Sequence, residues 1–130
     1  MKKLPLLLAL SILFLAFSNT SAQAKVRVKF ARGSSGVSLK GTVIGFAYKD
    51  YIVGAIAGQT INVKLTSRNS FTVSVVFLPN GDNLEGAVET DEFTGELPGS
   101  GNYVIRVLMM RAEARRKGSI SNYTLKISVR

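Results

Sequence analysis

The sequence predicts one all-β domain, an antiparallel β-sandwich of jelly-roll-like type with seven or eight short strands. Three observations support this fold class. Apolar and polar residues alternate with a period of two in most segments, and turns rich in glycine, proline and asparagine separate these segments at regular spacing. Only residues 112–116 show a helical period, and for no more than one turn. The sequence shows no repeats, low-complexity tracts or linker, so a single domain is expected.

The N-terminal 24 residues have the composition of a secretory signal peptide. Lys2 and Lys3 give a positive start, an apolar run follows over residues 4–17, and Ala22-Gln23-Ala24 is a small-x-small cleavage site. The run is shorter than the ~20 apolar residues that a membrane-spanning helix needs. We therefore expect a signal peptide over 1–24 and an exported domain over 25–130. The expected location is the periplasm, with the outside of the cell as the alternative, and no membrane contact is expected after cleavage.

Charge and residue types limit the chemistry of the exported chain. Residues 25–130 hold 15 basic and 8 acidic residues, a net charge of +7, and the sequence contains neither cysteine nor histidine. Zinc sites, Ser-His-Asp triads and Cys-His dyads cannot be built without these residues. Paired carboxylates remain possible, but most acids lie in one polar segment, 82–96, which does not match an EF-hand calcium loop. The sequence predicts a protein that is not an enzyme, needs no cofactor and is stabilised by its core rather than by disulfides.

The N-terminal half of the exported chain predicts four strands, at residues 25–31, 37–43, 48–56 and 60–66. In the first, Val26, Val28 and Phe30 alternate with three cations, which indicates a half-buried strand with a basic outer face. Gly41 lies within the second strand and is interpreted as a bulge. In the third strand, Tyr51 and the apolar residues in phase with it are expected to point inward.

The C-terminal half predicts four further strands, at residues 71–78, 93–97, 103–110 and 120–129. Alternation over 71–78 is interpreted as a central strand, which the turn at 79–82 ends. Residues 83–92 have no firm periodicity and form the least structured part. The strand over 103–110 is apolar on both faces, as a central strand requires. The last strand places Tyr123, Leu125, Ile127 and Val129 on one face.

Residues 97–117 combine a turn, a strand and a basic segment, and no other stretch carries so much specific chemistry. Pro98, Gly99 and Gly101 supply the fixed and permissive backbone angles of the turn. Tyr103 follows it, and two interpretations of this residue stay open. It is either a core tyrosine in phase with the inward residues of the strand, or an exposed aromatic anchor for a partner.

The basic segment contains Arg111 and Arg115 four residues apart, so one helical turn would place both on the same face. Two guanidiniums that point the same way suit a partner rich in carboxylates, because each can bind a carboxylate in a bidentate manner. The alternative is a solvated loop. A nucleic-acid partner is not expected, because the aromatic residues fall at core positions rather than between exposed cations.

Several motifs occur together between residues 41 and 130. They are Gly45-Phe46-Ala47-Tyr48, Ala57-Gly58-Gln59-Thr60, the segment 97–103, Arg106-Val107-Leu108, Arg111 with Ala114-Arg115, and Asn122-Tyr123-Thr124-Leu125. In this combination the chain resembles the periplasmic inhibitors of goose-type lysozyme, a family of secreted bacterial β-sandwich proteins. The segment 67–96 does not match the family residue by residue.

The resemblance implies a non-enzymatic inhibitor whose partner is a lysozyme, with the goose type favoured. In that family a Ser-Gly-x-Tyr turn and arginines downstream of it enter the lysozyme cleft. The implied contact residues are Ser100, Gly101, Tyr103, Arg111, Arg115 and, as a weaker match, Tyr48. The oligomeric state stays open.

The alternative is a non-catalytic accessory module that binds glycan or another envelope component. The Gly58-Gln59 turn and the pattern from Leu97 to Tyr103 are also similar to the pre-peptidase C-terminal β-sandwich modules of secreted enzymes. Such a module would bind on the opposite face of the sandwich or through residues 67–96. Retention on purified peptidoglycan distinguishes it from an inhibitor that binds only lysozyme.

Overall fold

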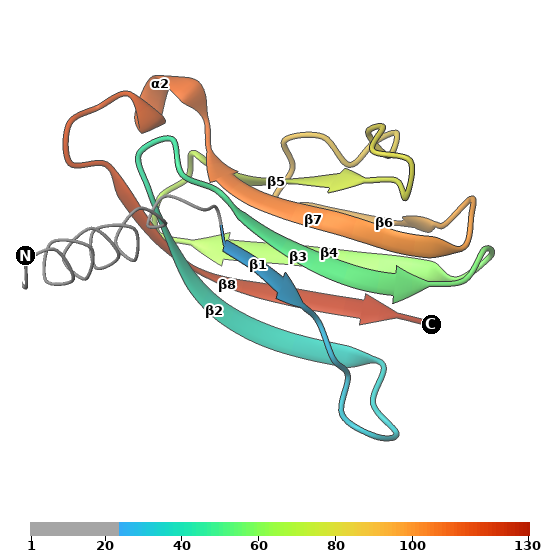
Figure 1. The fold of residues 1–130 in the computed structure, drawn as a ribbon. Coiled ribbons are helices and arrows are strands. Elements are labelled where there is room, and N and C mark those ends of the chain that lie inside the picture. Colours follow the sequence, from blue (N-terminus) through green and yellow to red (C-terminus); the bar gives the residue numbers. More distant parts are fainter. Residues whose placement is uncertain (1–23) are drawn as a thin grey trace, which may run out of the picture.

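The computed structural model describes residues 24–130, so the predicted signal peptide lies outside the described residues except for its last residue. The chain forms two four-stranded sheets that pack face to face (Figure 1). Sheet A has the order β1-β3-β7-β5, and sheet B has the order β2-β8-β4-β6. The elements are β1 (Ala24–Arg27), β2 (Gly36–Ile44), β3 (Lys49–Ala55), β4 (Thr60–Ser67), β5 (Thr72–Phe77), β6 (Glu92–Glu96), β7 (Gly101–Met109), α2 (Arg111–Ala114) and β8 (Ile120–Val129).

Odd-numbered strands form one sheet and even-numbered strands form the other, so each connection carries the chain from one sheet to its partner. Among the described strands every pairing is antiparallel except that of β1 with β3, which is parallel. The predicted all-β sandwich is confirmed, with eight strands. The period of two arises because alternate side chains of each strand face the space between the sheets.

The core lies in that space and is built mainly by the inward side chains of the central strands. The fully buried side chains of β7 and β8 include Tyr103, Ile105, Val107, Leu125 and Ile127. Tyr51 of β3 and Tyr123 of β8 meet from opposite sheets, with 2.7 Å between their hydroxyl oxygens. This hydrogen bond satisfies two buried polar groups at once. Burial raises the pKa of Tyr123 above its ordinary value, and the bond to Tyr51 raises it further.

The strand predicted to be central over 71–78 is not central, because β5 is the last strand of sheet A. It is nevertheless buried on both faces, and the segment that follows it folds back and pairs with its free edge. Ser74 and Thr90 exchange two backbone hydrogen bonds of 2.7 and 3.0 Å, and the Leu84 N–H donates to the Val76 carbonyl at 2.8 Å. The least structured segment of the sequence analysis therefore closes this side of the sheet.

The predicted bulge at Gly41 is wrong, since the β2–β8 register runs without interruption from Gly36 to Ile44. The glycine is required for a different reason. A Cβ atom at position 41 would project into the hydroxyl and ring of Tyr123 and would also crowd the hydroxyl of Tyr51. Because Gly41 has no side chain, the hydroxyl groups of Tyr51 and Tyr123 have room to meet beside it.

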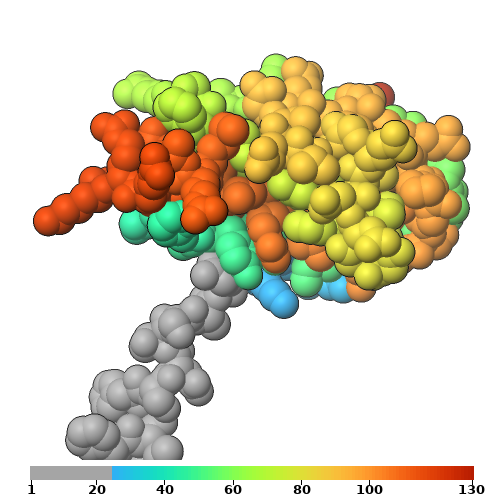
Figure 2. All heavy atoms as spheres, turned by 90° about the horizontal axis from the view of Figure 1, so that it is seen from above, coloured from blue at the N-terminus to red at the C-terminus, as the bar shows by residue number. Residues whose placement is uncertain are grey.

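The turns gather at two opposite ends of the sandwich (Figure 1). The serine end consists of the turns at 56–59, 79–82 and 97–101. The arginine end consists of the turns at 45–48 and 68–71 together with residues 110–119, which include α2. β7 runs from the serine end to the arginine end, and residues 110–119 project beyond the body of the molecule (orange-red in Figure 2). Within residues 24–130 no helix is long and apolar enough to cross a membrane.

Candidate functional site

The Ser100–Gly101 turn is hydrogen-bonded to the neighbouring turn at residues 56–59, at the serine end. The Ala57 N–H donates to Ser100 Oγ at 2.9 Å, and the Gly58 N–H donates to the Leu97 carbonyl at 2.8 Å, so the turn is fixed to its neighbour. Gly101 has φ of 143°, a value that favours glycine, and a Cβ there would lie 3.0 Å from two ring carbons of Pro79. The Ser100 side chain, although exposed, already accepts a backbone hydrogen bond.

Tyr103 is a core residue, as one of its two interpretations predicted. Its side chain has no solvent exposure. The hydroxyl donates to the Gly99 carbonyl at 2.6 Å and accepts from the Gly99 N–H at 3.2 Å. The interpretation of Tyr103 as an exposed aromatic anchor is therefore wrong. The residue holds the turn from inside instead of offering its ring to a partner.

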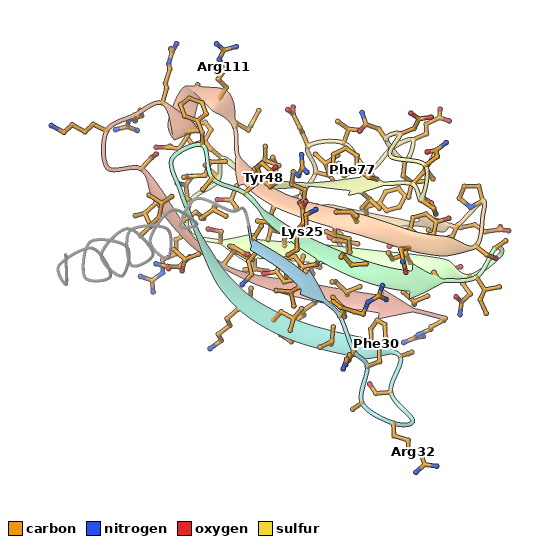
Figure 3. The ribbon with its side chains drawn as sticks, viewed as in Figure 1. Lys25, Phe30, Arg32, Tyr48, Phe77 and Arg111 are labelled. Carbon is orange, nitrogen blue, oxygen red and sulfur yellow. The ribbon has the colours of Figure 1, made fainter. Side chains whose placement is uncertain are left out.

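Arg111 begins α2 and Arg115 directly follows it, and α2 is the one helix within residues 24–130, which confirms the helical period seen over 112–116. The Arg115 N–H donates to the Arg111 carbonyl at 3.1 Å, and buried Ala114 anchors the turn on the core. Both arginine side chains are exposed, and neither forms an ion pair or side-chain hydrogen bond within residues 24–130. Arg111 points away from the body of the molecule (Figure 3).

Exposed apolar side chains lie at the same end of the sandwich as these arginines, and their grouping is not apparent from the sequence. They are Ile44, Phe46, Phe71, Met110 and Ile120, and Phe46 is the most exposed of them at 64%. Ile44 and Ile120 are directly opposite each other in the β2–β8 register, and the Met110 N–H donates to the Phe71 carbonyl at 2.8 Å. A signal was present in the sequence, because Ile44 and Ile120 occupy outward positions of alternating strands.

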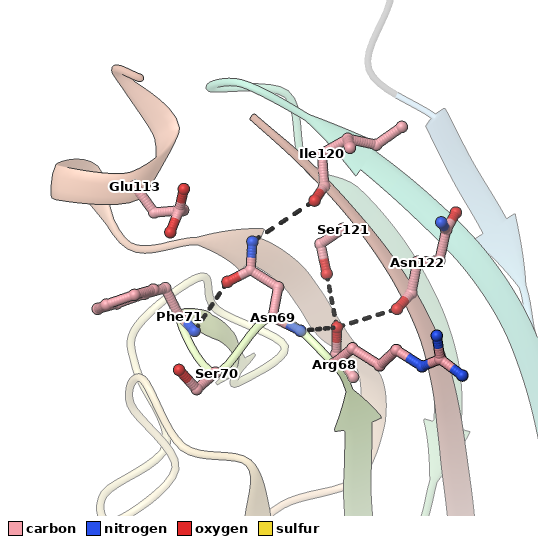
Figure 4. A pocket seen from close by; sticks show the side chains of 9 residues that line it. Arg68, Asn69, Ser70, Phe71, Glu113, Ile120, Ser121 and Asn122 are labelled. Carbon is pink, nitrogen blue, oxygen red and sulfur yellow. Dashed lines mark hydrogen bonds between the residues drawn. The ribbon is translucent and has the colours of Figure 1, made fainter. Parts of the chain in front are cut away.

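A hollow of about 650 Å³ opens between the 68–71 turn, α2 and the start of β8 (Figure 4). Asn69 holds its wall, because its amide oxygen accepts from the Phe71 N–H at 3.0 Å and its amide nitrogen donates to the Ile120 carbonyl at 3.5 Å. Phe71, Ile120, Arg68 and Glu113 all line this hollow. The arginine end therefore combines cations with apolar side chains around a recess.

Tyr48 lies on the outer side of sheet A, near the arginine end (Figure 3). The guanidinium carbon of Arg106 is 3.8 Å from the centre of the Tyr48 ring and 5.0 Å from that of Phe77. Arg106 also donates two hydrogen bonds to Asp50, which raise the pKa of the guanidinium. Arg106 is a residue whose importance sequence reasoning missed, although its motif had been noted.

The structure does not bring all six predicted contact residues together. Tyr48, Arg111 and Arg115 lie toward the arginine end, whereas Ser100, Gly101 and Tyr103 lie at the serine end. The second group lies at the start of β7 and the arginines follow its end, and a strand of nine residues spans roughly 30 Å. They form two separate surfaces.

No family model matches the chain. Comparison with individual proteins finds several relatives that are all described as inhibitors of g-type lysozyme. A curated Escherichia coli K12 protein described as an inhibitor of g-type lysozyme is 28% identical over 137 aligned positions, which cover 99% of this chain and 96% of that protein. The crystal structure of Aeromonas hydrophila PliG, a periplasmic lysozyme inhibitor of g-type lysozyme, is 34% identical with a TM-score of 0.71. It covers 82% of this chain and 96% of that one.

Two further structures extend this result. Salmonella Typhimurium PliG is 28% identical with a TM-score of 0.69, covering 84% of this chain and all of that one. The pre-peptidase C-terminal domain of a Bacillus anthracis collagenase has a TM-score of 0.53 at 15% identity, covering 86% of this chain and all of that domain, which shows a shared fold alone. The PliG relatives are described as periplasmic inhibitors, which confirms the expected location and the prediction of a protein that is not an enzyme.

Proposed function

The chain belongs to the family of periplasmic inhibitors of g-type lysozyme, and we propose from this premise that it is itself such an inhibitor and that its arginine end enters the lysozyme cleft. The observation that carries the second part is the pair of exposed guanidiniums of Arg111 and Arg115, one helical turn apart on a projecting loop without ion-pair partners among the described residues.

The chemistry of the target favours these two side chains. Glycoside hydrolysis by lysozyme depends on carboxyl groups in a substrate cleft. A guanidinium binds a carboxylate through two parallel hydrogen bonds and stays charged at any relevant pH. An inserted arginine would pair with such a carboxyl group and occupy the position of the sugar.

The surroundings of the arginines support a protein partner. Well-packed interfaces are enriched in aromatic residues and arginine at their centre. Phe46 and Phe71 supply exposed aromatic area beside Arg111 and Arg115. On the neighbouring face, Tyr48 is held by Arg106, so its ring would meet a partner without loss of side-chain freedom.

Long-range charge attraction contributes little to the association of the two proteins, because lysozymes are commonly basic and the exported chain carries a net charge of +7. The affinity therefore has to come from local complementarity of charge and shape at the contact surface. Glu89, Asp91 and Glu92 line a hollow together with Ser70 and Thr72, beside the 68–71 turn. These acids would offset repulsion between the two proteins close to the arginine end.

The test compares the two ends. We expect Arg111→Ala/Arg115→Ala to lower the inhibition of g-type lysozyme by roughly 100-fold, because truncating one partner of a buried charge pair typically costs ~2–5 kcal/mol. The readout is lysis of a peptidoglycan suspension at graded inhibitor concentrations, with chicken-type and invertebrate-type lysozymes in parallel. The thermal transition should stay unchanged, since both side chains are exposed.

Arg32→Ala/Arg130→Ala is the matched control, because it removes two exposed arginines without touching the arginine end. Ser100→Ala tests the serine end. Loss of inhibition in Ser100→Ala but not in the Arg111/Arg115 variant would assign the cleft to the serine end and overturn our choice of surface. A wild-type protein that inhibits no g-type lysozyme would overturn the proposed function itself.

A further inference from the structure

We propose that the outer face of sheet B is a second binding surface, for a carboxylate-bearing glycan, centred on Lys40, Lys64 and Lys126. We call these three residues the lysine group. The proposal does not depend on lysozyme inhibition. It starts from the composition of this face, which differs from that of the outer face of sheet A.

The outward side chains of sheet B are almost all small and polar. Apart from the lysine group they are Ser38, Thr42, Thr60, Asn62, Thr66, Glu92, Thr94, Glu96, Asn122, Thr124 and Ser128, with Ile44 and Ile120 at the arginine end. The outer face of sheet A, by contrast, carries the apolar residues Ile52, Val73, Val75, Phe77 and Val104 around the Arg106–Asp50 ion pair, with Lys25 and Arg27 at its edge. A solvent-facing sheet needs polar residues, but it does not need three lysines grouped together.

The lysines are grouped by strand register. Lys64 of β4 lies directly opposite Lys126 of β8, and Lys126 is diagonal to Lys40 of β2, whose own partner is Thr124. Directly opposed side chains have Cβ atoms about 5 Å apart and diagonal ones about 7–8 Å, so the three positive charges repel one another. Like charges in this arrangement reduce the stability of the fold. An anionic ligand that binds between them would offset this cost.

Within residues 24–130 no ion pair engages these three charges. All three lysines are exposed, and none forms an ion pair or a hydrogen bond through its ammonium group. Glu92 of β6 lies opposite Lys64 on its other side without forming an ion pair, and Glu96 lies further along the same strand. The face therefore keeps an excess of positive charge beside its polar floor.

Two hollows flank the lysine group. The larger, of about 750 Å³, has Lys40 and Arg68 beside Thr42, Thr66, Asn122 and Thr124. The smaller, of about 360 Å³, has Lys126 beside Ser38, Asn62 and Ser128. Each hollow thus combines a cation with hydroxyl and amide groups. Arg68 and Asn122 also line the recess at the arginine end, so the two hollows are adjacent.

This chemistry fits an acidic glycan better than other polymers. Ammonium groups bind carboxylates through charge-assisted hydrogen bonds, and threonine and asparagine exchange hydrogen bonds with sugar hydroxyl and amide groups. Away from Ile44 and Ile120, the face has no aromatic side chain on which a nucleic-acid base could stack and no apolar group that could enter a membrane. Lysine is depleted from protein–protein interfaces. In a periplasmic protein the carboxylate-bearing glycan within reach is peptidoglycan.

The experiment measures co-sedimentation of the exported chain with purified peptidoglycan in the absence of any lysozyme. We expect binding that falls with added salt and that is absent on chitin, a neutral glycan, and on peptidoglycan whose carboxyl groups have been amidated. Lys40→Gln/Lys64→Gln/Lys126→Gln should weaken binding about ten-fold, because it removes three solvent-exposed charge contacts, each of which contributes modestly. Its thermal transition should not fall, because the substitutions remove repulsion.

Lys25→Gln/Arg27→Gln/Lys29→Gln is the matched control, because it removes three exposed cations in and just after β1, the edge strand of sheet A. Equal loss in both triple variants would show attraction by net charge alone and would overturn the proposal, as would equal binding to amidated peptidoglycan. Capture of each variant by immobilised g-type lysozyme, without glycan, separates this proposal from the proposed function. The lysine-group variant should be captured as well as the wild type.

Discussion

Arg106 of β7 and Asp50 of β3 are directly paired on neighbouring strands of sheet A. The arginine donates two hydrogen bonds, of 2.8 and 3.0 Å, to the two carboxylate oxygens. The rings of Tyr48 and Phe77 lie against the guanidinium. Asp50 is only 3% exposed, whereas the Arg106 side chain keeps 31%. This difference in burial makes the two residues unequal partners.

Removing Arg106 should therefore destabilise the protein more than removing Asp50. Arg106→Ala leaves a buried carboxylate without its cation and should cost ~2–4 kcal/mol of unfolding free energy. Asp50→Ala leaves a guanidinium that still reaches water and should cost ~1–2 kcal/mol. Urea denaturation followed by tyrosine fluorescence measures both. Equal losses would contradict the inequality, and Arg106→Lys should lie between wild type and Arg106→Ala because an ammonium cannot bind in a bidentate manner.

Tyr103 should be a stability residue and not a contact residue. Tyr103→Phe removes the hydroxyl that bonds both backbone groups of Gly99 and should cost ~1–2 kcal/mol, with inhibition unchanged. Tyr103→Ala also leaves a core cavity and should cost ~3–5 kcal/mol. Thermal denaturation and the lysis assay together check this. A folded Tyr103→Phe protein without inhibitory activity would show that the serine end takes part in binding after all.

Gly41 should tolerate no side chain. Gly41→Ala places a methyl group against the hydroxyl and ring of Tyr123, and this overpacking should cost ~1–3 kcal/mol. Gly36→Ala in the same strand is the control, because its nearest neighbours would lie 3.7 and 3.8 Å away. The double variant Gly41→Ala/Tyr123→Phe should lose less stability than the sum of the two single variants, as coupled neighbours do. Additive losses would mean that the hydroxyl is not what limits the space.

The buried tyrosine pair should make stability depend on alkaline pH. Burial raises the pKa of Tyr123 in the folded protein above the unfolded value of about 10, so the folded state retains a proton that the unfolded state releases. The stabilisation is complete below pH ~10 and is lost progressively as the pH rises above it. Denaturation midpoints measured between pH 8 and 11 should fall less steeply for Tyr123→Phe than for wild type. Parallel slopes would argue against this assignment.

Much of the fold could be predicted from the sequence because burial in a sandwich imposes a period of two. The inward phase of β3 and β8 follows directly from Tyr51 and Tyr123 and the apolar residues in phase with them. The prediction failed for β5, whose residues are buried on both faces like those of a central strand. The segment over 83–91 pairs with its free edge, and that segment carries no periodicity to reveal where it packs.

The sequence by itself determined the fold class and the helical turn at the basic segment. The tertiary structure placed Ser100 and Arg111 at opposite ends of β7, although the family resemblance had assigned both to one contact site. The tertiary structure alone decided which distant residues meet. Phe46, Phe71 and Ile120 gather at one end, and Lys64 faces Lys126, because of strand order and register. Register is set by the packing of the whole core, and no single segment encodes it.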